Sequence, residues 1–298
     1  MMNRRNLLVG AGALSIAGCQ PAQTTADTEA VAKTVRDVPL DLAALEERFK
    51  GRMGFAFATE GAQGAWRGDE RFVYCSTFKL YLAAAMFIRA QKGLEDLSRQ
   101  VPITQDDMID HAPITEPALG RTLSLQDLMK GTVETSDNPA ANILLREMGG
   151  LEPMRQFYRD LGDTSTTVDR FEPTMNRLDG DKDTIVPVQS VKNLQKLLVD
   201  ADTPLNAASK QTLLKWLHDT PTGADRLKAG VPNGWSVAHK TGTGGYGPAN
   251  DIGVLYPSQG APIVVAAYFH GSPQSTPAQR EEAIAEATRQ LLVALGHG

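Results

Sequence analysis

The chain has 298 residues, of which 42% are hydrophobic and 22% are charged, and its formal net charge is -5 at pH 7. This is the composition of a globular protein that is long enough to bury a substantial core, in one large domain or in two closely packed lobes. A net negative chain with no Lys/Arg-rich run after its first few residues is not typical of nucleic-acid-binding proteins, which concentrate positive charge to neutralise phosphates.

Residues 1–19 have the features of an export signal. A basic segment, Asn3-Arg4-Arg5-Asn6, precedes a short apolar stretch from Leu7 to Ala17. The stretch is too short to remain as a membrane-spanning helix, and it ends in Ile16-Ala17-Gly18-Cys19, which is typical of a lipoprotein processing site. We therefore expect Cys19 to carry lipid and to anchor a periplasmic protein to the membrane, with an ordinary signal peptide cut nearby as the alternative. The arginine pair also fits twin-arginine export, so the Sec and Tat routes both remain open.

Residues 20–39 are rich in Ala and Thr and show little apolar periodicity, which predicts a flexible tether before a folded domain over residues 40–298. Strand patterns rich in Val, Ile, Tyr and Phe lie near both ends of that domain and are separated by Gly/Pro turns, which favours an antiparallel sheet. After an amphipathic helix around Leu40 to Lys50, the expected strands are Met53 to Thr59, a hairpin partner near Ala65, Ser236 to Thr241, Ile252 to Tyr256 and Pro262 to His270.

The middle of the chain has apolar residues at helical spacing, and a further helix closes the chain. The expected helices are Leu80 to Ala90, Leu125 to Thr132, Ala140 to Met148, Met154 to Leu161, Val188 to Val199, Ala207 to Leu217 and Pro277 to Leu295.

Ser76 and Lys79 are three residues apart where a helix is expected to begin, so they share one face and the amine can take the proton of the hydroxyl. Such a pair arises often by chance, and its weight comes from the motifs that follow it. Ser136-Asp137-Asn138 precedes Pro139 and a predicted helix, where the simplest interpretation is an N-cap cluster.

Lys240-Thr241-Gly242 lies on a predicted strand, where Gly242 allows a ligand to approach the backbone closely. Taken alone, Lys240 would be interpreted as a solvated strand lysine. A fourth segment, Arg170-Phe171-Glu172-Pro173-Thr174-Met175-Asn176, would alone be a charged surface loop.

These segments, in this order, resemble the class A serine β-lactamases from about Asp41 to the C-terminus. The interval between Ser76 and Ser136, 136 − 76 = 60 residues, is as expected for that family. The resemblance implies an α+β fold in which an α/β sandwich lobe (about 40–70 and 220–298) with an antiparallel five-stranded sheet joins an all-helical lobe (about 71–219). It also implies a monomer that hydrolyses penicillins or cephalosporins through a serine acyl-enzyme.

The resemblance gives each motif a role. Ser76 is the nucleophile, and Ser136 relays a proton to the departing lactam nitrogen. Glu172 is the base that activates water for deacylation, while the acylation base is either Lys79 or Glu172. The backbone N–H groups of Ser76 and Thr243 form the oxyanion hole. The residues implied in substrate or water binding are Asn138, Asn176, Lys240, Thr241 and Thr243.

Two further residues are implied in substrate binding. Arg226 matches a position where some class A enzymes, including several that hydrolyse carbapenems, place an arginine behind the carboxylate site; the alternative is an exposed arginine. His111 falls where the family usually has an aromatic gate, and the alternative is a surface histidine. The omega loop of the family is expected to close through Arg170 and Asp183, although the stretch between Asn176 and Asp183 is about two residues shorter than usual.

Other functions remain as alternatives. A penicillin-sensitive peptidoglycan peptidase would share most of these motifs but needs no water-activating Glu172, and a noncatalytic β-lactam sensor would stay acylated. Cys75, next to Ser76, is interpreted as a buried apolar side chain rather than as a nucleophile, and the second cysteine that some relatives pair with this position is absent. The 5 His residues are scattered without ligand spacing, so we expect no metal and no cofactor.

Overall fold

The computed structural model describes residues 35–245 and 247–297. The expected export signal, with Cys19, and the first part of the expected tether, residues 20–34, lie outside the described residues. The end of that tether is part of the fold, because Arg36–Asp37 form strand β1 and Val38 is buried. The folded domain therefore begins several residues before Asp41, where the resemblance was expected to start.

Within the described residues, one sheet contains six strands in the order β1-β3-β2-β10-β9-β8. The five longer strands pair antiparallel, which confirms the expected five-stranded sheet, and the two-residue β1 adds a sixth strand that pairs parallel with β3. Both ends of the chain supply strands, as the sequence predicted. The long strands are β2 (Gly51–Thr59), β3 (Ala62–Trp66), β8 (Ser236–Thr243), β9 (Pro248–Tyr256) and β10 (Ile263–Gly271).

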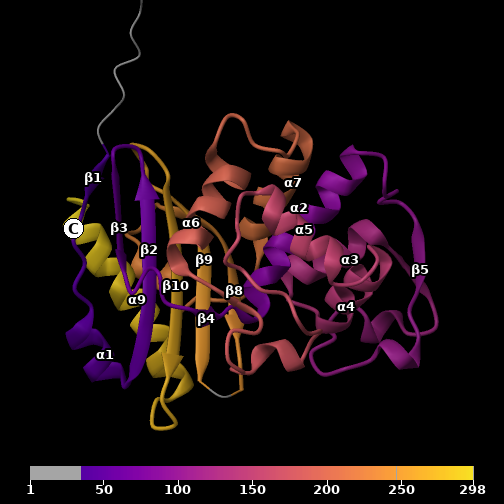
Figure 1. The fold of residues 1–298 in the computed structure, drawn as a ribbon, viewed down its shortest axis with the longest axis horizontal. Coiled ribbons are helices and arrows are strands. Elements are labelled where there is room, and N and C mark those ends of the chain that lie inside the picture. The colour runs from indigo at the N-terminus through magenta and orange to yellow at the C-terminus, as the bar shows by residue number, and fades with distance from the viewer. Residues whose placement is uncertain (1–34, 246, 298) are drawn as a thin grey trace, which may run out of the picture. The chain divides into compact units, whose positions relative to one another are not determined.

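The sheet is buried on both faces, which explains why its central strands are apolar almost without interruption. In β10, alternate residues enter two different hydrophobic cores. One core lies against helices α1 (Ala43–Phe49) and α9 (Pro277–Ala294), and the other lies against the helical lobe (Figure 1). Val265, Ala267 and Phe269 belong to the first core, and Val264, Ala266 and Tyr268 belong to the second.

The helical lobe is built from the middle of the chain, and its helices begin at recognisable signals. Ser124 and Asp127 form a capping box at the start of α3, and Pro187 opens α6. The helix expected from Val188 to Val199 is split, because α6 ends at Leu194 and a π-helical turn continues it to Val199. The helices of this lobe are α2 (Phe78–Gln91), α3 (Leu125–Glu134), α4 (Asn138–Glu147), α5 (Glu152–Asp160), α6 (Pro187–Leu194) and α7 (Ala207–Asp219).

Two short strand pairs tie loops together, and one of them positions the site. Strand β4 (Phe72–Val73) pairs with β7 (Thr184–Ile185), which joins the segment just before Ser76 to the segment just after Asp183. The second pair, β5 (Gln100–Pro102) with β6 (Thr122–Ser124), lies farther out in the helical lobe. The short α8 (Leu227–Gly230) follows Arg226.

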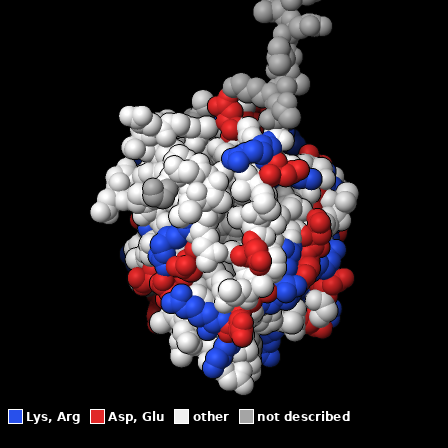
Figure 2. Space-filling model, turned by 90° about the vertical axis from the view of Figure 1, so that its left-hand side faces the viewer, with Lys and Arg blue, Asp and Glu red and all other residues white. Residues whose placement is uncertain are grey.

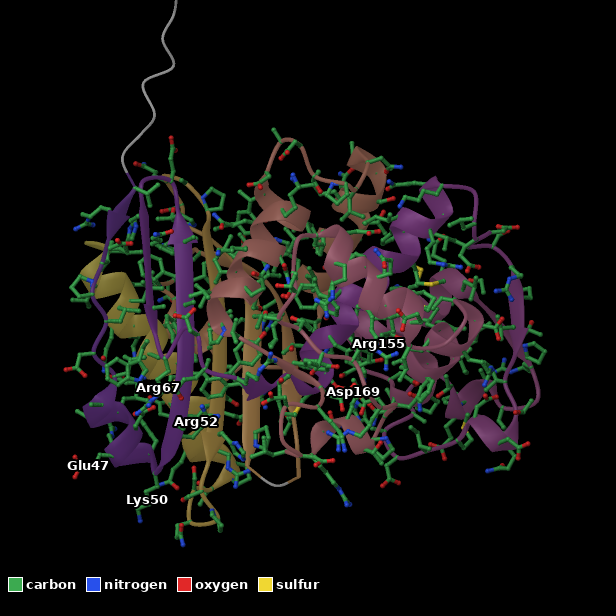
Figure 3. All side chains as sticks on the ribbon, in the orientation of Figure 1. Glu47, Lys50, Arg52, Arg67, Arg155 and Asp169 are labelled. Atoms are coloured by element: carbon green, nitrogen blue, oxygen red, sulfur yellow. The ribbon has the colours of Figure 1, made fainter. Side chains whose placement is uncertain are left out.

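Acidic and basic side chains are interspersed on the face of the molecule that Figure 2 shows, rather than gathered into a single basic patch. Arg52 and Arg67, labelled in Figure 3, show the same pattern, since Arg52 pairs with Glu70 at 2.7 Å and Arg67 pairs with Glu46 at 2.8 Å. In the part of the chain that the structure describes, every helix is too short or too polar to cross a bilayer.

Candidate active site

Ser76 lies in a tight turn between β4 and α2, packed against the edge strand of the sheet. The turn is a short 3-10 helix (Cys75–Thr77), and Cys75 has the left-handed φ of 47° that reverses the chain there. Strand β8 passes so close that a Cβ on Gly242 would lie 2.7 Å from the carbonyl oxygen of Tyr74 and 3.1 Å from the nitrogen of Ser76. Glycine at this position therefore allows a close contact between strand and turn, whereas the sequence had indicated the close approach of a ligand at Gly242.

Lys79 lies one helical turn after Ser76, and its amine is fully buried among oxygen atoms. Its Nζ donates to the carbonyl oxygen of Ser136 at 2.7 Å and to Oδ1 of Asn138 at 2.6 Å. It also lies 3.2 Å from Oε1 of Glu172. Helix α2, which follows the Ser76 turn directly, thus brings its lysine against both the Ser136 motif and Glu172.

Glu172 is the residue that joins the other groups of the site. Its side chain is buried, and its Oε1 accepts a hydrogen bond from the hydroxyl of Ser76 at 3.3 Å. Its Oε2 accepts from Nδ2 of Asn176 at 2.5 Å. Oδ1 of Asn176 is buried and has no hydrogen-bond partner among the described residues. This oxygen is available to accept a hydrogen bond from a water molecule beside the Glu172 carboxylate.

The Glu172 loop (residues 169–183) is closed by ion pairs and backbone bonds. Arg170 pairs with the buried Asp183 at 2.5 Å, and the N–H groups of Asp169 and Arg170 donate to the same carboxylate. Arg155 of α5 lies 4.0 Å from Asp169 and also binds the carbonyl of Val168. Figure 3 labels Arg155 and Asp169, which lie near each other. The expected Arg170–Asp183 closure is therefore present even though the stretch after Asn176 is short.

Lys240 projects from β8 toward Ser136 and completes a cluster of cations. Its Nζ donates to Oγ of Ser136 at 3.1 Å, and Lys79 donates to the same oxygen at 3.4 Å. Because both amines use the Ser136 oxygen as an acceptor, the Ser136 proton is free to be donated elsewhere. Ser136 has a left-handed φ of 61°, a conformation that is uncommon for serine and occurs at functional turns.

Burial shifts the protonation equilibria of the site. It lowers the pKa of the Lys79 amine, although the Glu172 carboxylate opposes that shift. Burial and the charge of Lys79 together bring the pKa of Lys240 well below its usual value. For Cys75 the direction is opposite, since burial and the nearby Glu172 raise the pKa of its thiol. A buried thiol of this kind is a poor nucleophile, which agrees with its interpretation as an apolar side chain.

The outer end of β8 presents two threonine hydroxyls. Thr243 is exposed, and its Oγ1 accepts from the Arg226 guanidinium at 2.8 Å. Arg226 is only 5% exposed and also donates to the carbonyl oxygens of Gly242 and Asn250, so it supports the strand end from behind. It is not the exposed surface arginine that was its alternative.

Asn138 and His111 make hydrogen bonds within the protein. Besides accepting from Lys79, Asn138 donates its Nδ2 to the carbonyl of Asp110 at 2.9 Å. Nε2 of the exposed His111 lies 2.9 Å from the carbonyl oxygen of Thr135. The structure therefore brings Asn138 into the central network, while His111 lies at the border of that network. The backbone of His111 has a left-handed φ of 66°.

Several residues that support the site were not singled out from the sequence. Asn142 binds both the N–H and the carbonyl of Glu172, at 3.0 and 2.9 Å. Asp137, fully buried, caps α4 and accepts from the N–H groups of Ile114 and Thr115. Nothing in the sequence marked Asn142, because the predicted helix began at Ala140. The observed start of α4 at Asn138 is what places the two amides four residues apart on one helix face.

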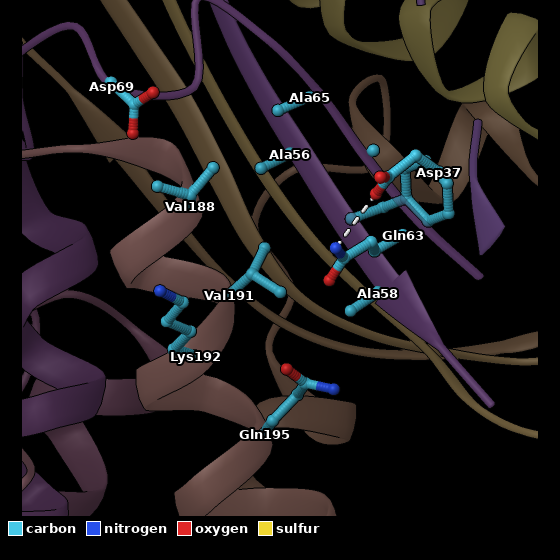
Figure 4. A pocket seen from close by; sticks show the side chains of 12 residues that line it. Asp37, Ala56, Ala58, Gln63, Ala65, Asp69, Val188, Val191, Lys192 and Gln195 are labelled. Atoms are coloured by element: carbon cyan, nitrogen blue, oxygen red, sulfur yellow. Dashed lines mark hydrogen bonds between the residues drawn. The ribbon is translucent and has the colours of Figure 1, made fainter. Parts of the chain in front are cut away.

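A separate cavity of about 310 Å³ lies between α6 and the sheet, away from these residues (Figure 4). Ala56, Ala58 and Val191 form part of its apolar wall, and Gln63 donates to Asp37 at its rim. It contains none of the predicted site residues. Of these two sites, the polar network around Ser76 is therefore the better candidate for chemistry, because a hydroxyl, an amine and a carboxylate meet there and the cavity lining contains no hydroxyl side chain.

Comparisons with known proteins agree with this geometry. Residues 38–295 match the model of the β-lactamase enzyme family. The chain is 37% identical over 249 residues to β-lactamase CTX-M-8 of Citrobacter amalonaticus, covering 82% of this chain and 85% of the relative. It is 38% identical over 279 residues to β-lactamase L2 of Stenotrophomonas maltophilia, covering 90% and 91% of the two chains.

A solved structure of an ancestral (GNCA) class A β-lactamase superimposes with a TM-score of 0.81 at 41% identity, covering 85% of this chain and 98% of the other. Sequence family, relatives and fold thus agree along almost the whole described domain. The chain belongs to the class A serine β-lactamases, enzymes that hydrolyse the β-lactam amide bond and so confer resistance to β-lactam antibiotics.

Proposed function

We propose that this enzyme hydrolyses penicillins and cephalosporins through an ester on Ser76, with Lys79, Ser136 and Glu172 transferring the protons. The observation that carries the proposal is the position of Glu172, which contacts the hydroxyl of Ser76, the amine of Lys79 and the amide of Asn176 at once. One carboxylate can therefore serve the nucleophile first and the hydrolytic water afterwards.

In the acylation step, Oγ of Ser76 attacks the lactam carbonyl carbon and loses its proton. Glu172 supports this step as the acceptor of the Ser76 hydrogen bond. Lys79 is the other candidate base, because its lowered pKa increases the share of neutral amine. When the ring C–N bond breaks, Ser136 gives its proton to the ring nitrogen, and its Oγ then receives a proton from Lys79 or Lys240.

In the deacylation step, a water molecule attacks the carbonyl carbon of the Ser76 ester, the bond between that carbon and Oγ breaks, and the proton taken from the water is returned to Oγ. We place this water between Glu172, which takes its proton, and Oδ1 of Asn176, which is free to accept a hydrogen bond. The backbone N–H groups of Ser76 and Thr243 would stabilise the oxyanion in both steps. Their proximity is supported by the close approach of Gly242 to the Ser76 nitrogen.

Substrate binding is assigned to the residues around this network. Asn138 would bind the side-chain amide of the substrate, and His111 would border the entrance. Thr241 and Thr243 would bind the substrate carboxylate, with Lys240 and Arg226 supplying positive charge nearby. Every one of these groups comes from a single chain, so we propose the monomer as the active unit.

Hydrolysis of a chromogenic cephalosporin by the purified mature protein tests the proposed function. We expect many turnovers per enzyme molecule, because the Glu172 carboxylate can take a proton from the water that attacks the ester. A reaction that stops after one equivalent would instead indicate a penicillin-sensitive peptidase or a β-lactam sensor, both of which acylate without this base.

We also propose that the enzyme is exported to the periplasm, by the Sec or the Tat route, and is held on the membrane by lipid on Cys19. The basic segment, the short apolar stretch and the sequence Ile16-Ala17-Gly18-Cys19 support this proposal. Replacing Cys19 with Ala should move the activity from the membrane fraction to the soluble periplasmic fraction. Cys75→Ala is the matched control, since that cysteine is buried in the domain, and equal partitioning of the Cys19 variant and the wild type would contradict lipidation.

A further inference from the structure

A row of three threonine hydroxyls leads from the outer end of β8 to the end of α3. Oγ1 of Thr241 lies 3.0 Å from Oγ1 of Thr222, which in turn lies 2.9 Å from Oγ1 of Thr220. The hydroxyl of Thr220 donates to the carbonyl oxygen of Glu134 at 2.8 Å. Thr220 and Thr241 are only 2% and 7% exposed, so these hydroxyls bond chiefly to one another rather than to solvent.

The direction of the hydrogen bonds is fixed at one end of this row only. A hydroxyl has one proton, so Thr220, which donates to Glu134, can only accept from Thr222. Thr222 has one proton and two acceptors, the oxygens of Thr220 and Thr241. If it donates to Thr220, Thr241 must donate to Thr222 and presents lone pairs to the ligand. If it donates to Thr241, the Thr241 proton is free to face the ligand.

When the Thr222 hydroxyl turns from Thr220 to Thr241, Oγ1 of Thr220 still accepts one hydrogen bond. The backbone N–H of Thr222 donates to Oγ1 of Thr220 at 3.3 Å in either arrangement. The two states therefore differ by the rotation of two hydroxyls, those of Thr222 and Thr241, and the second state replaces the hydrogen bond from Thr222 to Thr220 by one from Thr241 to the ligand. A ligand can thus select between them through its own charge.

Thr243 provides the contrast. Its Oγ1 accepts from the Arg226 guanidinium, which can only donate, so the Thr243 proton always remains available to a ligand. The segment between α7 and α8, residues 220–226, thus supplies both partners, Arg226 for Thr243 and Thr222 for Thr241. One hydroxyl of the pair is fixed as a donor and the other is reversible.

We propose that Thr222 is a positioning residue that sets which way Thr241 presents its hydroxyl, with the proton toward an anionic group of the substrate or with the lone pairs toward a hydrogen-bond donor. The inference rests on the proposed function, because it places the substrate carboxylate at Thr241 and Thr243. Preference for an anionic ligand at this end of the site then depends on a residue that need not touch the ligand.

Two isosteric substitutions test the proposal. The probes are phenylboronic acid and 3-carboxyphenylboronic acid, which bond to a nucleophilic serine, and the measurement is the ratio of their inhibition constants. Thr222→Val should reduce the preference for the carboxylate-bearing probe about 3- to 10-fold. In this variant Thr241 no longer accepts the hydrogen bond from Thr222, and that bond both holds the Thr241 rotamer and strengthens the hydrogen bond that Thr241 donates to the ligand. Thr220→Val should leave the ratio unchanged or increase it, because Thr222 can then donate only to Thr241.

Further measurements separate this role from simple support of the fold. Thr222→Ser keeps the hydroxyl and should keep the ratio, and thermal unfolding shows whether each variant is folded. An unchanged ratio in Thr222→Val, an equal loss in Thr220→Val, or a loss in Thr222→Ser would each overturn the proposal. Mass analysis after exposure to a slow β-lactam follows the ester on Ser76 in every protein. If the wild type forms no such ester the proposed function fails, whereas a Thr222→Val variant that acylates normally but keeps the ratio contradicts only the role of Thr222.

Discussion

Replacing Ser76 with Ala should abolish turnover of penicillins and cephalosporins, with a loss on the order of 10⁴- to 10⁶-fold in kcat. Ser76 is the hydroxyl that contacts Glu172, and without it no ester can form. The backbone of the turn should survive the change, because Cys75 and Gly242 set its shape and neither depends on the Ser76 oxygen. Steady-state kinetics and thermal unfolding of the same preparation measure both effects.

Cys75→Ala is the matched control, since it removes the neighbouring thiol and leaves the hydroxyl in place. That variant should still be acylated on Ser76 by a slow β-lactam, because burial raises the pKa of the Cys75 thiol and makes it a poor nucleophile. Peptide mapping after brief exposure to a slow β-lactam locates the acyl group. Label on any residue other than Ser76, or retained turnover in Ser76→Ala, would show that the nucleophile has been assigned wrongly.

The placement of two site motifs on their elements followed from local patterns in the sequence, whereas the grouping of all four motifs into one site was implied only by the resemblance to the class A β-lactamases. The spacing of Ser76 and Lys79 fixes a shared helix face, and Pro139 after the Ser136 motif fixes the start of α4. The long strands followed from apolar alternation and turns. These patterns are short-range, and each element can be derived from the residues that form it.

Features that depend on contacts between distant segments could not be derived in this way. Strand β1 exists because Arg36–Asp37 find a partner in β3, and a two-residue strand leaves no periodic pattern. The roles of Asn142 and Thr222 depend on segments 30 and 19 residues away in the chain. Asn and Thr are common on helices and in loops, so nothing in their immediate neighbourhood marks them as partners of the site.

Glu172 distinguishes a β-lactamase from proteins that share only its acylation groups, and Glu172→Gln isolates that difference. The substitution keeps the shape of the side chain and removes its ability to take a proton from water. Deacylation should slow by about 10²- to 10⁴-fold, which is the usual contribution of a general base, so the acyl-enzyme should accumulate.

Acylation should fall less than deacylation in this variant. The Glu172 carboxylate opposes the lowering of the Lys79 pKa, so its removal lowers that pKa further. More of the amine is then neutral at working pH and able to accept the Ser76 proton. Acylation by Glu172→Gln should accordingly persist to a lower pH than it would if Lys79 had the pKa of an ordinary, solvent-exposed lysine.

Stopped-flow kinetics with a penicillin measure both steps in one experiment, and intact-mass analysis identifies the trapped species. We expect one equivalent of fast reaction followed by very slow turnover, with the added mass on Ser76. Glu47→Gln makes the same chemical change on the exposed surface of α1 and should turn over like the wild type. If Glu172→Gln also turns over like the wild type, the water is activated by another group. If instead acylation and deacylation slow equally, Lys79 cannot act without Glu172, and the carboxylate is the base for both steps.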